Sequence, residues 1–309
     1  MSEVRFKAQN GPVETEGKSA GQEAVVQFWI IQTLNGIAYG MLLFLLSTGL
    51  SLILGMMNIA NMAHGAFYLL TSYVGYSVAR STGNFPLALL VGALTGLAIG
   101  FVTERLFLRS LLGRTHSQVL VTLGIALIIA DAALVIWHGD PVTVRPPALL
   151  ARSIDLWIMR FPAYRIFIIA CGLVILVALN LVLGRTRLGA IIRASVDNRE
   201  MARAMGINIE KVFMLTFGFG SLLAGFAGVM GAPFLSVYPG LDWELLPLSL
   251  VVIIVGGIGS INGAIVGSLI LGLLDNYGRA LFPDLAYFTL FVPMIVILAF
   301  RPGGLLPRR

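Results

Sequence analysis

The chain has 309 residues, of which 58% are hydrophobic and only 12% are charged, and its formal net charge at pH 7 is +6. An ordinary soluble domain is about 25% charged, so this composition excludes a soluble enzyme or a soluble binding module and predicts an integral membrane protein. The 35 glycines follow no G-X-Y period, which excludes a collagen-like chain. The single cysteine, Cys171, excludes both an internal disulfide and a cysteine-based metal site.

The chain begins with a polar stretch of mixed charge, residues 1–26. This stretch has no apolar segment followed by small residues, so we expect a polar N-terminal tail rather than a cleaved signal peptide. Hydrophobic runs with short connections then follow, which predicts a single transmembrane domain over residues 27–304 and a C-terminal tail at 305–309.

About eight hydrophobic runs approach or exceed the ~20 residues that a transmembrane helix needs. They cover residues 27–56, 62–79, 86–107, 117–137, 165–183, 211–234, 246–275 and 287–300. The sequence therefore predicts an all-α, polytopic integral membrane protein.

Basic residues in the connections predict the orientation of the chain. The stretch 184–210 is the richest in arginine, which places it in the cytoplasm. By parity, 104–116 lies on the same side, and 235–245, which has two acidic residues and no basic one, lies outside. The connection 138–165 must then also be external, although it carries Arg145, Arg152, Arg160 and Arg165, and this disagrees with the rule.

Two of the runs are interrupted at corresponding places. The first interruption extends over residues 55–65, and the second reads Gly256-Gly257-Ile258-Gly259-Ser260-Ile261-Asn262-Gly263. Each follows an aliphatic stretch and precedes a helix start of small residues. Interrupted segments at matching positions in two halves point to a transport site. If each interruption is a half-helix that turns back, both termini are cytoplasmic.

These interruptions supply most of the candidate residues for a translocation path. The candidates are Asn58, Asn61, His64, Asp131, Gly256, Gly257, Gly259 and Ser260. The histidine and the two asparagines either line the path or satisfy backbone groups that the break frees. The aspartate lies within an apolar run, where it marks a path or a partner, or makes an interhelical hydrogen bond.

The cytoplasmic stretch 193–208 predicts a short amphipathic helix that ends at Gly206 as a C-cap. Such a helix is either a solvated loop or a docking element for a partner. No G-x-x-x-x-G-K-[ST] motif is present, so the chain does not hydrolyse ATP by a P-loop route. A transporter of this kind must obtain its energy through contact with another subunit.

Several motifs resemble known permeases. Glu200, Ala202 and Gly206 match the E-A-A-x-x-x-G coupling loop of ABC-importer permeases, with Met201 as the middle residue. Asn61-Met62-Ala63-His64-Gly65 resembles the signature of branched-chain amino-acid permeases of the LivH type. Residues 187–194, 256–264 and 301–304 resemble further landmarks of that family in the same order, so the resemblance covers roughly residues 28–304.

The resemblance implies a permease subunit of an ABC importer in the bacterial inner membrane. Its implied partners are a homologous second permease, two ATP-binding subunits, a periplasmic substrate-binding protein and membrane lipid, with no nucleic acid. ATP and Mg²⁺ are expected on the partner subunits, and this chain is expected to hold no cofactor, metal or catalytic residue. The implied contacts with the ATPases are Arg193, Glu200, Ala202 and Gly206.

The expected substrate is a branched-chain or similar hydrophobic amino acid, moved by alternating access. The Met62 variant of the signature also occurs in urea and amide permeases, and Asn262 stands where proline is common, so a urea or short-amide permease is an alternative. A stand-alone, ion-coupled secondary transporter is an alternative of another class. The scarcity of membrane carboxylates and the coupling-loop pattern are evidence against this alternative. A membrane enzyme is not favoured either, because the sequence contains no cluster of catalytic residues.

Overall fold

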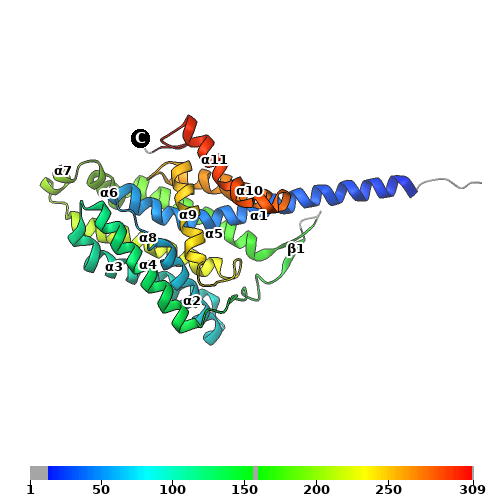
Figure 1. Cartoon of the computed structure of the whole chain (residues 1–309), viewed down its shortest axis with the longest axis horizontal. Coiled ribbons are helices and arrows are strands. Elements are labelled where there is room, and N and C mark those ends of the chain that lie inside the picture. The colour runs from blue at the N-terminus through cyan, green and yellow to red at the C-terminus, as the bar shows by residue number, and fades with distance from the viewer. Residues whose placement is uncertain (1–12, 156–158, 308–309) are drawn as a thin grey trace, which may run out of the picture.

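The computed structural model describes residues 13–155 and 159–307, which form a bundle of helices with one short hairpin (Figure 1). The helices are α1 (Val13–Met57), α2 (His64–Thr82), α3 (Phe85–Thr103), α4 (Thr115–Trp137), α5 (Ala163–Arg185), α6 (Arg187–Asp197), α7 (Arg199–Ala204), α8 (Ile209–Gly231), α9 (Leu241–Gly256), α10 (Ile261–Leu281) and α11 (Ala286–Phe300). Shorter helical segments are the π-helical η1 (Glu104–Leu108) and the 3-10 helices η2 (Arg109–Leu111) and η3 (Pro283–Leu285). The strands are β1 (Ser153–Asp155) and β2 (Arg160–Pro162).

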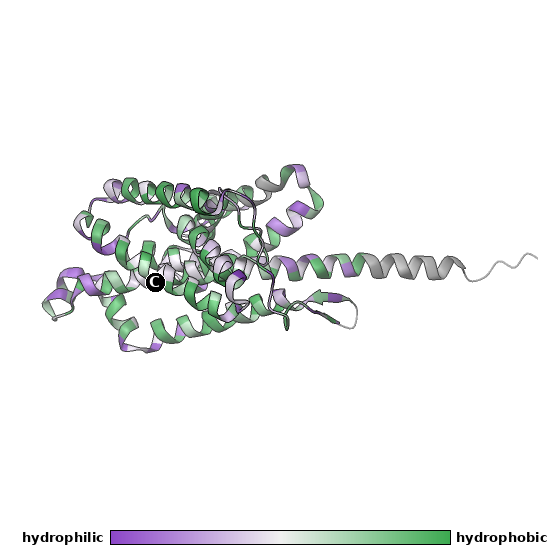
Figure 2. Ribbon diagram, turned by 90° about the horizontal axis from the view of Figure 1, so that it is seen from below, coloured by the Kyte–Doolittle hydropathy of each residue, from purple (hydrophilic) through white to green (hydrophobic). Residues whose placement is uncertain are grey.

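The described part of the chain contains 5 helices that are long and apolar enough to cross a membrane, and 6 spans if the pair α9–α10 is one span. That pair is bent by 119° at its break. Hydrophobic residues extend along the bundle helices, and hydrophilic ones gather at loops and helix ends (Figure 2). The predicted polytopic helical architecture is therefore present, but the eight hydrophobic runs do not become eight spanning helices, because α2 and α11 do not meet the same standard.

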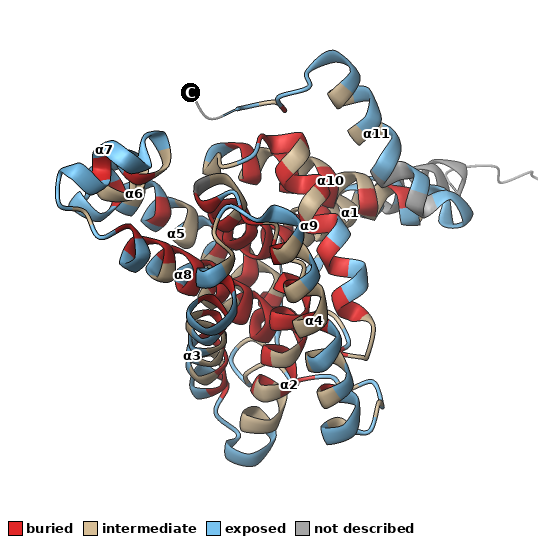
Figure 3. Cartoon of the chain, turned by 60° about the vertical axis from the view of Figure 1, so that its left-hand side comes forward, coloured by how far each residue is buried: buried red, intermediate tan, exposed pale blue. Residues whose placement is uncertain are grey.

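Helices α1, α8, α9 and α10 form the buried centre of the bundle (Figure 3). Residues 41–46 of α1 are each at most 3% exposed. Small residues allow the helix backbones to approach closely: Gly40 on α1 lies against Ser268 of α10, and Gly220 on α8 lies against Gly49 of α1. The core of the protein is thus a set of closely packed backbones around α1.

Helices α4 and α5 lie at the outside of this core, and only 17% of the apolar window of each helix is buried. Their exposed side chains are large and apolar, including Ile128, Val135 and Val174. Contact with lipid tails or with another membrane subunit is favourable for such an apolar surface, whereas contact with water is not.

The connections on one side of the bundle are joined by backbone pairing. Val142 and Val237 form an antiparallel bridge, so 138–165 and 235–245 share one face, as parity predicts. Two of the four discordant arginines have partners there. Arg160 pairs with Asp155 across the β1–β2 hairpin, with Nε and Oδ1 3.0 Å apart, and Arg165 contacts Asn35 and the ring of Phe234. At the opposite face, Arg109 and Glu210 form an ion pair.

The prediction of two turning half-helices is wrong for the first interruption. Helix α1 continues without a break from Val13 to Met57 and then ends, and its N-terminal half projects from the bundle beyond β1 (Figure 1). A single glycine such as Gly49 costs a helix interior about 1 kcal/mol, and here it provides the close contact with α8. Because α1 does not turn back, the two ends of the described chain lie on opposite sides of the bundle.

Candidate functional site

The first interruption is the connection between α1 and α2. Asn58 ends α1 with a left-handed backbone at φ 55°, and its N–H donates to the Leu54 carbonyl at 3.0 Å. Asparagine tolerates this conformation better than most residues, which suits it to a helix C-cap. The side chain of Asn58 is exposed, whereas Asn61 and His64, which lie closer to α2, are fully buried.

His64 and Asn61 fix the start of α2 against α1. The Nε2 atom of His64 lies 2.9 Å from the Leu46 carbonyl oxygen, and Oδ1 of Asn61 accepts the N–H of Ala63 at 3.1 Å. The contact of Asn61 satisfies a backbone N–H group at the break, which is one of the two roles expected for this residue. The bond from His64 reaches the interior of α1 rather than the broken backbone, so it joins two helices instead of capping one.

A buried polar patch surrounds this junction. Several side-chain atoms in it have no hydrogen-bond partner within the described residues: Nδ1 of His64, Nδ2 of Asn61, the hydroxyls of Ser47 and Thr48, and Oδ1 of Asp242. Unpaired polar atoms are costly in a membrane interior, and a cluster of them is typical of a functional pathway. The serine and the threonine, in α1, and the aspartate, in the first turn of α9, are not among the predicted path residues.

The second interruption separates α9 from α10. Gly257 and Gly259 adopt φ 112° and φ 77°, which other residues rarely adopt. Ser260 is the N-cap of α10, because its Oγ accepts the N–H of Gly263 at 3.0 Å. The C-terminal segment lies against this break: the N–H groups of Leu305 and Leu306 donate to the carbonyls of Val255 and Gly256 at 2.8 and 2.9 Å.

The two interruptions meet in space. A Cβ atom placed on Gly55, two residues before the end of α1, would overlap the backbone of Gly259. The interruptions are therefore brought together, as expected of segments at corresponding places in two halves. Asp131 is not brought there: it is exposed on α4, which packs mainly on α2 and the η1–η2 turns.

The arginine-rich stretch forms two helices, α6 and α7, rather than one. Asn198 separates them and caps α7 by accepting the N–H of Met201 at 2.9 Å. The four residues predicted to contact the ATPases lie along these two helices. Arg193 is partly exposed on α6, and Glu200 is exposed in the first turn of α7. Ala202 is buried, and Gly206 follows the end of α7 with φ 82°. Glu200 is stabilised at this position by the positive end of the helix dipole.

Arg199 connects α7 to the first interruption. Its Nη2 donates to the main-chain carbonyl of Met57 at 3.0 Å, and its guanidinium lies 4.8 Å from the ring centre of Phe213 on α8. In α6, Ile192 and Val196 pack against the cluster around Leu52 of α1. The sequence pattern predicts Arg199 in the basic stretch 184–210 but not its contact with the end of α1, because no local feature indicates a bond between residues 142 positions apart.

Two methionines make the tip of α7 apolar. Met201 and Met205 are 60% and 77% exposed and lie four residues apart, so both project from one face of the turn. Exposed methionine at a surface otherwise made of charged residues is typical of a protein–protein contact.

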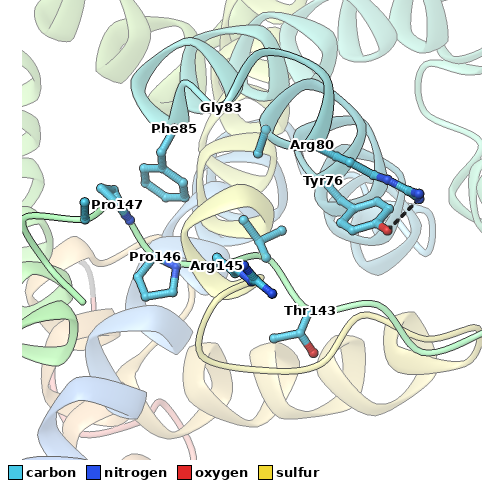
Figure 4. Close-up of a pocket in the computed structure, with 11 residues that line it drawn as sticks. Tyr76, Arg80, Gly83, Phe85, Thr143, Arg145, Pro146 and Pro147 are labelled. Atoms are coloured by element: carbon cyan, nitrogen blue, oxygen red, sulfur yellow. Dashed lines mark hydrogen bonds between the residues drawn. The ribbon is translucent and has the colours of Figure 1, made fainter. Parts of the chain in front are cut away.

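A cavity of about 550 Å³ opens on the opposite face, between the end of α2 and residues 143–148 (Figure 4). Arg80 and Arg145 line it from its two sides, and Nη1 of Arg80 donates to the hydroxyl of Tyr76 at 3.1 Å. The cavity is thus basic, and it contains one of the external arginines that the orientation rule does not explain.

Comparison with known proteins places this chain among permeases. The profile of the family described as "Branched-chain amino acid transport system / permease component" matches residues 32–299. The chain is 26% identical over 302 residues to the high-affinity branched-chain amino acid transport system permease protein BraD of Pseudomonas aeruginosa, covering 92% of this chain and 97% of BraD.

Two further relatives are equally informative. The probable branched-chain amino acid transport permease protein LivH of Methanocaldococcus jannaschii is 30% identical over 249 residues, which are 78% of each chain. The ribose import permease protein RbsC of Escherichia coli (strain K12) is 30% identical over 283 residues, covering 84% of this chain and 78% of RbsC. Permeases named for different solutes therefore share similar identity with this chain.

Proposed function

Because the chain belongs to the branched-chain amino acid transport permease family, we propose that it carries an apolar amino acid across the membrane as one permease subunit of a complete ABC importer. It is a multi-pass permease of the bacterial inner membrane. The single transmembrane domain is residues 27–304, and the solute passes beside the two interruptions.

The hydrogen bond between Arg199 and the Met57 carbonyl is the observation that carries this proposal. It joins the exposed helices α6 and α7 directly to the end of α1, where the first interruption begins. An ATPase that binds Met201 and Met205 would therefore pull on the backbone beside the Gly55–Gly259 contact. Residues Arg193, Glu200, Ala202 and Gly206 form the rest of this docking element.

The mechanism that we propose is alternating access. ATP and Mg²⁺ bind to two partner ATPases, whose closure moves α6 and α7, and a substrate-binding protein delivers the solute at the face that holds residues 138–165. The close glycine contacts between α1, α8 and α10 allow these helices to slide without separating large side chains. A homologous second permease completes the passage.

A branched-chain or similar hydrophobic amino acid is the proposed solute, as in the names of BraD and LivH. The similar identity to a ribose permease means that the solute is selected by particular side chains and not by the fold. The urea or amide permease and the ion-coupled secondary transporter are not favoured, since the relatives compared are named permeases for amino acids and ribose.

Purification of the tagged chain from its native membrane in mild detergent tests the assembly. Mass spectrometry is expected to identify two ATPase copies and a second permease. Proteoliposomes that contain the purified assembly are then supplied with the binding protein. They are expected to take up leucine only when ATP is present on the side of the membrane where the ATPases bind. A chain that purifies alone, or uptake abolished by an uncoupler and not by ATP depletion, would contradict the proposal.

A matched pair of variants tests the role of α7. Gly206 and Gly184 both have open space where a Cβ would lie, but only Gly206 has a positive φ. We expect Gly206→Ala to lower ATP-driven uptake by distorting the end of α7, and Gly184→Ala, in α5, to leave uptake unchanged. Equal uptake by the two variants would remove Gly206 from the coupling element.

A further inference from the structure

A second cavity, of about 290 Å³, lies between α1, α9, α10 and the connection 234–238. This connection contains Val237, which pairs with Val142 in the external connection, so the cavity lies in the outer half of the bundle. Ligand cavities commonly measure about 300–1,000 Å³, and a cavity at the lower end of this range suits a solute of amino-acid size. None of its lining residues is among the predicted path residues.

The cavity is lined by charged residues of both signs. Nε of Arg279 lies 2.9 Å from both carboxylate oxygens of Asp275 on α10. The aspartate side chain is 6% exposed and that of the arginine is 59% exposed, so the pair presents mainly its cationic end to the cavity.

A carboxylate faces this pair from another helix. Glu244, in the first turn of α9, lines the same cavity and is exposed. It has no ion-pair partner within the described residues. The cavity therefore offers one site for an ammonium group and another for a carboxylate.

Part of the remaining wall is apolar. Leu245 and Leu248 on α9 are buried and line the cavity, together with Phe234 from the preceding connection. An aliphatic side chain placed there would remove its apolar surface from water at about 25 cal/mol for each Å².

We propose that this cavity binds the zwitterion of an aliphatic amino acid on its way from the binding protein to the interruptions. Glu244 accepts hydrogen bonds from the ammonium group, the exposed edge of Arg279 donates to the carboxylate, and Leu245 and Leu248 contact the side chain. Asp275 is a positioning residue that holds Arg279. This inference rests on the proposed function, because it assumes an amino-acid solute.

The test uses the purified transporter complex in nucleotide-free proteoliposomes. The one cysteine of the chain is first replaced by Cys171→Ser, and Ser236→Cys then introduces a reporter thiol at the cavity wall. The rate of its reaction with a small methanethiosulfonate is followed by mass spectrometry of that peptide. Ser81→Cys, at the exposed outer end of α2, provides the control reporter.

Leucine at about ten times its Kd is expected to slow labelling at the Ser236→Cys position about tenfold, and not at the Ser81→Cys position. Isoamylamine, which lacks the carboxylate, and 4-methylvalerate, which lacks the ammonium group, are expected to protect far less. Glu244→Gln and Arg279→Gln are each expected to remove the protection by leucine, whereas Asp284→Asn, at an exposed acid outside the cavity, leaves it intact.

The inference is overturned if the complex takes up leucine with ATP but leucine protects neither reporter, or if isoamylamine protects as well as leucine. It is also overturned if Glu244→Gln, in a complex that retains its partners, leaves protection unchanged. Failure of the proposed function has a different signature: no ATPase co-purifies, or the complex takes up a solute other than an amino acid.

Discussion

The guanidinium of Arg199 donates a hydrogen bond to the main-chain carbonyl of Met57, with a nitrogen–oxygen distance of 3.0 Å, although the two residues are 142 positions apart in the sequence. Among the described residues, it is the one hydrogen bond from a side chain of α7 to the backbone of α1. The Arg199 side chain thus joins α7 directly to the last residue of α1.

Arg199→Ala is expected to lower ATP-driven uptake by about tenfold without preventing assembly. A hydrogen bond from a charged donor contributes about 1.5–3 kcal/mol, and we take the lower end because this contact is only partly buried. Uptake is measured in proteoliposomes and normalised to co-purified ATPase. Arg203→Ala, at an exposed arginine of the same helix, is the control, and equal uptake by the two variants would contradict the transmission through Met57.

The contact between Gly55 and Gly259 leads to a prediction about stability. Gly55→Ala is expected to lower the thermal unfolding midpoint, because the added Cβ would overlap backbone atoms of Gly259 that cannot rotate away. The midpoint is measured by fluorescence-detected size-exclusion chromatography after heating.

Gly124→Ala is the matched control for this substitution. A Cβ at Gly124 on α4 meets nothing within 4 Å, and alanine is favoured over glycine in a helix by up to about 1 kcal/mol, so this variant is expected to keep or raise the midpoint. A Gly55→Ala variant as stable as Gly124→Ala would mean that the two interruptions separate easily.

Local sequence features predicted where the two interruptions lie, but not that α1 runs straight into the first of them. Asn58, Gly257, Gly259 and Ser260 each act through their own backbone or a neighbour within three residues, as a left-handed cap, a turn or an N-cap. Such preferences depend on the residue type itself. The same reasoning predicted the glycine at the end of α7.

Long-range packing could not be predicted in the same way. The path of α1 depends on the close approach of α8 and α10 to its glycines, which makes Gly49 a packing residue and not a break. Asp131 and Asp275 both lie in apolar helices, and only the packing of the neighbouring helices leaves one exposed and the other buried beside Arg279. The cavity around Glu244 involves residues from four segments of the chain.

His64→Ala is expected to reduce stability more than transport. The substitution removes the contact with the Leu46 carbonyl and leaves a cavity in a fully buried region, which together cost about 2 kcal/mol or more. The unfolding midpoint is expected to fall, and uptake per assembled complex is expected to stay close to that of the unchanged transporter. An unchanged midpoint with abolished uptake would instead place His64 in the path.

Asp131 and Asp242 provide the last comparison, because both are acidic residues of apolar helices in different surroundings. Asp131 is exposed on α4, whereas Asp242 is 3% exposed in the first turn of α9 and belongs to the buried polar patch. A carboxylate at a helix N-terminus stabilises the helix by about 0.3–2 kcal/mol, and only Asp242 has this position. We therefore expect Asp242→Asn to lower the unfolding midpoint and uptake, and Asp131→Asn to change neither; the reverse order would show that the solute or a partner subunit depends on the outer face of α4.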